Sequence, residues 1–129
     1  MISKKYRLSE SNVKKVLKFG KPFFSYGMVL NYKNNNVENN RFAIIISGKN
    51  ISGSVERNFF RRRFYEIIEL QIKPENGNLL RLEKQKTYYD LVFVLKKQTI
   101  LSKKNLDSVN SFDNDIKFLL KKTNLTQDI

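Results

Sequence analysis

The sequence predicts one folded domain in which α-helices and β-strands are mixed. Three observations predict it: the chain has 129 residues, three segments carry apolar residues at helical spacing, and three others carry them at the spacing of strands. A chain of this length buries most of the surface of its unfolded state when it folds around a single core. Hydrophobic residues make up 40% of the chain, with 10 Phe and 6 Tyr among them, which is enough to form that core. We therefore treat residues 1–129 as a single domain.

The first predicted element is a short helix that ends at Phe19. Ser9 is a suitable N-cap, and Gly20, followed by Lys21 and Pro22, supplies a stop signal. Three apolar residues within the segment recur at the spacing of one helix face: Val13, Val16 and Leu17.

Two strands are predicted next. Residues 24–32 alternate large apolar or aromatic side chains with smaller ones, and residues 41–46 form a nearly continuous apolar run of the kind that lies inside a sheet. The Asn-rich segment 34–40 between them is typical of a turn. We therefore expect the two strands to pair as a hairpin. One face of the first strand would carry Phe24, Tyr26, Met28, Leu30 and Tyr32.

The second half of the chain predicts a long helix, a strand and a final helix. A glycine-containing turn leads into the long helix at residues 54–72, residues 73–85 are expected to form a loop, residues 88–95 a strand and residues 105–122 the last helix. The long helix has a face that we expect to pack on the sheet: Phe60, Phe64, Ile67, Ile68 and Gln71. The last helix is expected to turn a second set mostly inward: Leu106, Val109, Asp113, Ile116, Leu119 and Leu120.

The formal net charge is +13, from 25 Lys and Arg residues against 12 Asp and Glu, and it is concentrated in three segments. Residues 1–23 carry a net +6, residues 41–65 carry +5 and residues 81–104 carry +5. Grouped basic residues on a folded domain indicate a surface for a polyanion such as a nucleic acid. A basic surface kept for solubility is the alternative. No separate role for the third segment follows from the sequence.

The chain contains no Cys and no His, which excludes a zinc finger, an imidazole metal site and catalysis by a thiol or a Ser-His-Asp triad. The carboxylates show no acid–base pair, because Asp113 and Asp115 point in different directions on a helix and the glutamates of the long helix are interleaved with arginines. We therefore predict no catalytic residue and no metal ligand. The longest apolar runs, residues 42–46 and 91–95, are too short to span a membrane, so we expect a soluble cytoplasmic protein.

Basic residues of the long helix are the leading candidates for a binding site. Four of them follow the glycine-containing turn: Arg57, Arg61, Arg62 and Arg63. Guanidinium groups bind phosphate oxygens in pairs, and the first turn of a helix adds N–H groups that favour anions. Asn58 can bond a base edge or a 2′-hydroxyl, and Lys49 lies in the turn before the helix. The alternative is a solvated surface on which the arginines pair with three glutamates: Glu56, Glu66 and Glu69.

Aromatic side chains of the first strand are a second candidate. Phe24, Tyr26 and Tyr32 can stack unpaired bases, as the sheets of RNA-binding proteins do. The alternative is that these rings belong to the core, which is where one face of a half-buried strand usually packs.

Taken together, residues 41–66, with the sequence RFAIIISGKNISGSVERNFFRRRFYE, resemble the protein component of bacterial ribonuclease P. That family has a strand, then a Ser-Lys-Lys-type turn, then a helix with an Arg-Asn-Arg signature and further basic residues. The positions that match in the turn, in the signature and in the basic pair after it are Ser47 and Lys49, Arg57 and Asn58, and Arg61 and Arg62. The order of the predicted elements extends the resemblance over about residues 4–122.

The chain departs from this family pattern at several positions. Phe59 replaces the third signature residue, and Tyr65 stands where another Arg is common. Val13 and Leu17 occupy the two positions of the first helix that are usually aromatic in the family and line its substrate groove. Stacking of the substrate strand is then expected to shift to other rings: Phe19, Tyr26 or Tyr32.

The resemblance implies a two-layer α/β sandwich, in which helices pack on one side of a small, mostly antiparallel sheet. It also implies a left-handed β-α-β crossover that carries the arginine helix, as in the second domain of a ribosomal protein of the small subunit. The core of the domain is expected at about residues 4–122.

For function, the resemblance implies a subunit of an enzyme whose chemistry is carried by RNA. The RNA subunit would cut precursor tRNA at the 5′ end of the mature tRNA, with Mg²⁺ held by the RNA and not by the protein. The protein would bind that RNA through Lys49, Arg57, Asn58, Arg61, Arg62 and Arg63. It would hold the single-stranded 5′ leader of precursor tRNA in a groove lined by Val13, Leu17, Phe19, Tyr26, Met28 and Tyr32. No further protein partner and no membrane are expected.

Two other functions are compatible with some of these features. A ribosomal or other RNA-binding module of similar fold would keep the basic helix but would have no role in tRNA cleavage. A stand-alone nuclease is disfavoured, because the chain lacks the His and paired carboxylate ligands that such an enzyme uses.

Overall fold

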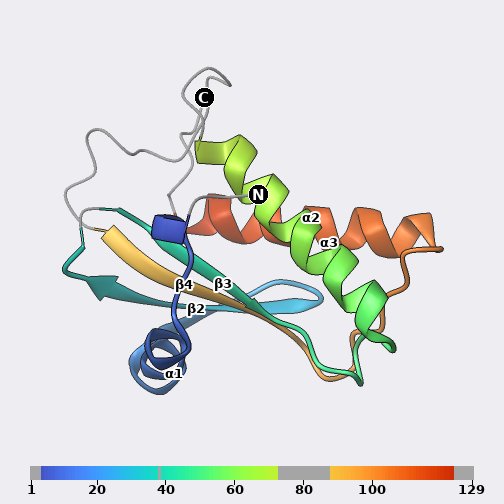
Figure 1. The fold of residues 1–129 in the computed structure, drawn as a ribbon, viewed down its shortest axis with the longest axis horizontal. Coiled ribbons are helices and arrows are strands. Elements are labelled where there is room, and N and C mark those ends of the chain that lie inside the picture. The colour runs from blue at the N-terminus through green and yellow to red at the C-terminus, as the bar shows by residue number, and fades with distance from the viewer. Residues whose placement is uncertain (1–3, 38, 73–87, 124–129) are drawn as a thin grey trace.

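The computed structural model describes residues 4–37, 39–72 and 88–123, and it has a mixed α/β fold (Figure 1). The expected loop at residues 73–85 lies outside the described residues. In chain order the elements are the 3₁₀ turn η1 (Lys4–Tyr6), α1 (Glu10–Phe19), β1 (Lys21–Phe24), β2 (Met28–Asn35), β3 (Arg41–Ile45), α2 (Ser54–Ile72), β4 (Tyr88–Leu95) and α3 (Leu106–Lys122).

The four strands form one sheet in the order β1-β2-β4-β3. The pairs β1–β2 and β2–β4 are antiparallel, and β3 pairs with β4 in parallel. The sheet is therefore mostly antiparallel, as predicted, and α2 forms the crossover between its two parallel strands. The expected hairpin of residues 24–32 with residues 41–46 is wrong, because β4 lies between them. The physical reason is that β4 is the strand with most buried residues, and such a strand is most stable with neighbours on both edges.

The strand expected at residues 24–32 is in fact the end of β1, a tight turn and the start of β2. Ser25 makes the turn: its N–H donates to the carbonyl oxygen of Met28 at 2.9 Å, and its Oγ accepts from the N–H of Met28 at 3.2 Å. The chain reverses here, so the alternation of residues 24–32 does not lie on one face. Phe24 pairs with Val29, whereas Phe23 pairs with Leu30.

Helices cover both faces of the sheet, with α2 and α3 on one face and α1 on the other (Figure 1). Rings from three elements meet in the larger core: Phe64 lies 5.0 Å from Phe93, and Phe60 lies 4.9 Å from Phe112, between ring centres. Val16 of α1 packs with Ala43 and Val92 in a smaller core. The expectation of helices on one side only is therefore wrong. The central strands are apolar on both faces, so each face requires a helix to cover it.

Helix α1 is held close to β2 at its C-terminal end. Ser9 is the N-cap, as predicted, and accepts a hydrogen bond from the N–H of Asn12 at 3.4 Å. A Cβ atom at Gly20 would lie 2.5 Å from the carbonyl oxygen of Val16 and 2.8 Å from that of Tyr32. Only glycine fits there, and this close approach sets the position of α1 over the sheet.

The predicted apolar faces of the two longer helices are largely confirmed. Phe60, Phe64, Ile67 and Ile68 of α2 are buried; the side chain of Gln71 lies outside the described part. On α3, Val109, Ile116, Leu119 and Leu120 are buried as predicted. Leu106 is 71% exposed, so the prediction that its side chain points toward the core is wrong. It is the first residue of α3, and the first buried residue of this helix is Val109. Within the described ranges, no helix has the length and apolar character needed to cross a membrane.

Candidate nucleic-acid interface

The turn before α2 is fixed by the buried side chain of Asn50. Its Oδ1 accepts from the Oγ of Ser47 at 2.9 Å, and its Nδ2 donates to the carbonyl oxygens of Lys96 and Thr99, both at 2.8 Å. These bonds tie the turn to the loop that follows β4. Lys49 lies beside Asn50 in this turn and is exposed. A rigid turn therefore presents a basic side chain next to the start of α2.

Arg57 connects the turn to the helix. Its Nη1 donates to the carbonyl oxygen of Ile51 at 3.1 Å, and its backbone N–H donates to the carbonyl oxygen of Gly53 at 3.1 Å. The side chain is half-buried, and the bond to Ile51 uses one of its N–H groups. Since a guanidinium has five donors, Arg57 can hold the turn and still donate to a phosphate.

The next turn of α2 carries Asn58, Arg61 and Arg62. Arg61 Nη1 donates to Asn58 Oδ1 at 3.1 Å, and Asn58 and Arg62 are exposed. We call Lys49, Arg57, Asn58, Arg61 and Arg62 the arginine surface. Within the described part of the chain, no carboxylate forms an ion pair with its three arginines. Among the described residues, the structure therefore shows no ion pair between these arginines and the glutamates of the same helix.

Arg63 is separate from the arginine surface, contrary to the prediction that grouped them. Its Nε donates to Asp113 Oδ1 at 2.6 Å, and its Nη2 donates to Asp113 Oδ2, so the two side chains form a bidentate ion pair between α2 and α3. The hydrogen bond to Asp113 is the main reason why the pKa of Arg63 is raised. The charge of Arg63 is already matched inside the protein, and its role is to join two helices. Helical spacing alone does not reveal a partner 50 positions away.

Arg7 lies next to the arginine surface, and sequence reasoning missed it. The N-terminal segment runs beside β3, where the N–H of Leu8 donates to the carbonyl oxygen of Phe42 at 3.0 Å. Burial raises the pKa of Tyr65, and the positive charges of Arg7 and Arg61 oppose that rise, which places both arginines near the same ring. The Arg7 Nε atom is buried and has no hydrogen-bond partner in the described part of the chain. The cluster of basic residues at the start of the chain was the only signal in the sequence.

A row of apolar side chains lies partly open on the face of the sheet that α1 covers. The strand register aligns Phe24 with Val29, Val29 with Val94, and Val94 with Ile45. Phe24 is 56% exposed and the other three are half-buried. We call these four residues the open strip. The neighbouring row contains Val92 and Ala43, which are covered by Val16 of α1.

The residues predicted for a leader groove divide into three groups. Val13, Leu17 and Phe19 lie on α1, with Val13 packed on the smaller core and the other two exposed. The prediction for Met28 is wrong, because this side chain is fully buried in the larger core on the opposite face.

Tyr32 packs against that same core, with its ring stacked on Phe23 at 5.1 Å, so its prediction is also wrong. Tyr26 is 92% exposed at the turn between β1 and β2. The open strip was missed because residues 24–32 were interpreted as one strand. Recognising the Ser25–Gly27 turn would have placed Phe24 and Val29 together on one face.

The described residues contain no cluster of three or more His, Cys, Asp or Glu side chains that could hold a metal ion. Two candidate surfaces result: a basic surface on α2 whose arginines have no carboxylate partner among the described residues, and an apolar strip on the face of the sheet that α1 covers.

The comparison with family models decides the family. The model described as Ribonuclease P matches residues 2–123. The chain belongs to the Ribonuclease P family. Comparison with curated proteins finds no match.

Solved ribonuclease P proteins share the fold. A Staphylococcus aureus RNase P protein mutant with defective mRNA degradation activity is 18% identical, with a TM-score of 0.69 over 95% of this chain and 91% of that chain. An RNase P protein from Thermotoga maritima is 19% identical, with a TM-score of 0.62 over 90% of this chain and 96% of that chain. At these identities the likeness concerns the fold.

One departure from the ribonuclease P signature has a structural explanation. Phe59, which stands at the third signature position, is half-buried against the larger core, and its ring lies edge-on to Phe60 at 5.1 Å. This ribonuclease P protein therefore uses the position for packing.

Proposed function

We propose that the chain is the protein subunit of a ribonuclease P that removes the 5′ leader of precursor tRNA. It binds the catalytic RNA subunit through the arginine surface and holds the single-stranded leader on the face of the sheet beside α1. The observation that carries the proposal is the set of arginines on α2 that face solvent without a carboxylate partner among the described residues.

The arginine surface suits a folded RNA backbone. Guanidinium groups make strong, charge-assisted bonds to phosphate oxygens, and each contact releases condensed counterions. Arg57 and Arg61 lie one helical turn apart, and Arg62 is next to Arg61 on the exposed side of α2. Arg7 adds charge beside Arg61. Such a surface binds RNA strongly without reading individual bases.

The open strip suits an unpaired strand. Its side chains are apolar and partly exposed, and single-stranded nucleic acids place bases on such platforms while cations follow the backbone. Lys96 Nζ lies 5.9 Å from the ring centre of Phe24, at the outer end of the strip. A base on Phe24 would have its phosphate near this ammonium group.

The chemistry in this proposal belongs to the RNA. Mg²⁺ would be held by phosphate oxygens of the RNA and would supply the Lewis-acid chemistry of hydrolysis there, with no ligand from the protein. The protein orients the precursor tRNA and screens the repulsion between two RNA molecules. Its partners are then the RNA subunit and precursor tRNA, with no further protein required, and its location is the cytoplasm.

Reconstitution tests the proposal. Adding the protein to the RNA subunit should raise the rate of 5′ leader removal from precursor tRNA at low Mg²⁺. The reason is that positively charged side chains of the protein replace part of the Mg²⁺ that otherwise screens the RNA phosphates. The assay measures cleavage of end-labelled precursor tRNA with and without protein. Tight binding to the RNA subunit with no gain in cleavage would instead identify a general RNA-binding module.

A further inference from the structure

The turn between β1 and β2 is unusually well anchored for a turn that exposes an aromatic ring. The carbonyl oxygen of Gly27 accepts from the N–H of Lys96 at 3.0 Å and from Thr99 Oγ1 at 2.9 Å. Asp115 of α3 lies against the same turn, next to Gly27. A Cβ atom at Gly27 would lie 2.8 Å from Asp115 Oδ2, so only glycine permits this contact.

Tyr26 is at the apex of this turn. Its backbone is held by its two neighbours, yet its side chain is 92% exposed. An ordered backbone that presents an exposed aromatic ring is a common feature of stacking sites, because little conformational entropy is lost when a second ring binds.

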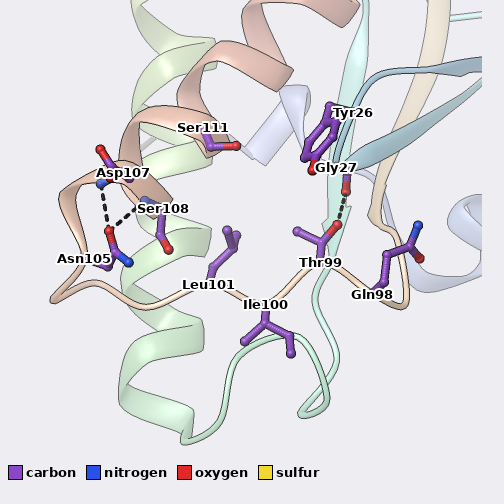
Figure 2. A pocket seen from close by; sticks show the side chains of 10 residues that line it. All are labelled: Tyr26, Gly27, Gln98, Thr99, Ile100, Leu101, Asn105, Asp107, Ser108 and Ser111. Atoms are coloured by element: carbon purple, nitrogen blue, oxygen red, sulfur yellow. Dashed lines mark hydrogen bonds between the residues drawn. The ribbon is translucent and has the colours of Figure 1, made fainter.

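A hollow of about 410 Å³ lies beside Tyr26 (Figure 2). It is bounded by the β1–β2 turn, the loop after β4 and the first turns of α3. Figure 2 shows Tyr26 on one side of the hollow, Asn105 and Ser108 on the other, and Ser111 on α3 above Ser108.

The lining suits a nucleobase better than a phosphate. Tyr26 offers an aromatic ring on which a base can stack. The hydroxyls of Ser108 and Ser111 can both donate and accept hydrogen bonds, which matches the donors and acceptors on the edge of a base. Asp107, in the first turn of α3, adds a negative charge at the edge of the hollow, which disfavours a phosphate there.

Lysine side chains lie outside the hollow, where the phosphate backbone of a bound strand would run. Lys96 is bonded to the turn through its N–H, and its ammonium group lies 5.9 Å from the ring centre of Phe24. Lys97 is exposed next to it. Phe24 is the outer member of the open strip and is two residues from Tyr26. The third basic segment of the sequence, residues 81–104, thus contributes lysines between the open strip and the hollow.

We propose that this hollow binds one unpaired nucleobase of single-stranded RNA, stacked on Tyr26. The strand leaves the open strip at Phe24, passes Lys96 and places its next base in the hollow. The inference rests on the proposed function, since the RNA that would bind is the 5′ leader of precursor tRNA. It adds a base-binding subsite beyond the sheet.

The experiment compares full-length variants in the reconstituted holoenzyme. Affinity is measured for precursor tRNAs whose leaders are shortened one nucleotide at a time, and 5-iodouridine is placed at each leader position for photo-crosslinking. Tyr26→Ala removes the ring, and Tyr26→Phe keeps it. Phe118→Ala is the matched control, because Phe118 is an exposed ring on α3 outside the hollow, with Lys122 Nζ 5.6 Å from its centre.

We expect one leader nucleotide to crosslink to Tyr26, and the affinity gained from that nucleotide to fall about fivefold or more in Tyr26→Ala. Tyr26→Phe and Phe118→Ala should keep that gain. The inference is overturned if Tyr26→Ala keeps the full affinity gained from that nucleotide, or if Phe118→Ala loses as much of it as Tyr26→Ala does. If the wild-type protein neither binds precursor tRNA nor raises cleavage, the proposed function fails as well; if it does both and only Tyr26 is without effect, the hollow alone is refuted.

Discussion

Neighbouring arginines on α2 have different partners and therefore different roles. Arg62 is exposed without a carboxylate partner in the described residues, whereas Arg63 forms two hydrogen bonds with Asp113 of α3. Residue type and spacing could not separate them, because the partner of Arg63 is on another helix. The sequence predicted the location of the basic cluster correctly, but which of its members are available to a ligand depends on the tertiary fold.

This difference predicts opposite effects of two single substitutions. Arg63→Ala should lower the free energy of unfolding by about 1 kcal/mol, a modest loss because the pair is partly open to solvent, and leave RNA affinity nearly unchanged. Arg62→Ala should lower RNA affinity and leave stability unchanged. Urea unfolding and RNA-subunit binding of both variants check this. If Arg63→Ala lowers RNA affinity while the free energy of unfolding is unchanged, Arg63 binds RNA together with the arginine surface.

Asp115 predicts a pH dependence of stability. Burial raises the pKa of its carboxyl group, and hydrogen bonds from Ser25 and Gly27 and the charge of Lys96 only partly offset this. Because the folded pKa is above the unfolded one, the stabilising contribution of the protonated group is complete below the unfolded pKa and is lost as pH rises through the folded pKa. The stability advantage of the wild-type protein over Asp115→Asn should therefore be largest in acid and shrink toward neutral pH. Urea unfolding at several pH values measures it, and an advantage that grows with pH would show that burial does not dominate.

Among the elements, the helices were easier to predict than the pairing of the strands. Periodicity identified all three helices and the buried residues of α2, because an apolar face is a local property of the sequence. The insertion of β4 between β2 and β3 depends on which strand gains most from two neighbours, and no local pattern records it. The turn at Ser25 was hidden because Phe24 and Met28 keep the alternation of a single strand across it.

The position of α1 on the sheet depends on Gly20. Gly20→Ala would push a methyl group against two backbone carbonyls, so α1 must shift away from β2. We expect a loss of about 1–3 kcal/mol in the free energy of unfolding. Gly48→Ala is the control, because its new methyl group would meet only Arg57 Nη1, at 3.5 Å. Equal unfolding midpoints for both variants would mean that α1 does not require this close approach.

At the scale of the molecule, the +13 charge is organised by the fold. The N-terminal segment brings Arg7 to the arginine helix, and Asn50 connects the turn before that helix to the loop that carries Lys96. Basic segments that are far apart in the sequence thus adjoin at neighbouring surfaces. The resemblance to the family predicted a basic helix, whereas the position of the open strip could be read only from the strand register.

We propose that the arginine surface, and not the overall positive charge, binds the catalytic RNA. The most direct test is the affinity for the RNA subunit over a series of salt concentrations for three proteins: wild type, Arg61→Ala with Arg62→Ala, and Lys117→Ala with Lys121→Ala. Both double variants remove two exposed or half-exposed positive charges, the second pair from α3.

We predict that the arginine double variant weakens binding roughly tenfold or more and lowers the slope of log affinity against log salt by about two, because each arginine neutralises about one phosphate group of the RNA. The lysine double variant should keep an affinity and a slope close to those of the wild type. Equal decreases in affinity and slope in the two double variants would contradict the claim, because they would show that net charge alone drives binding.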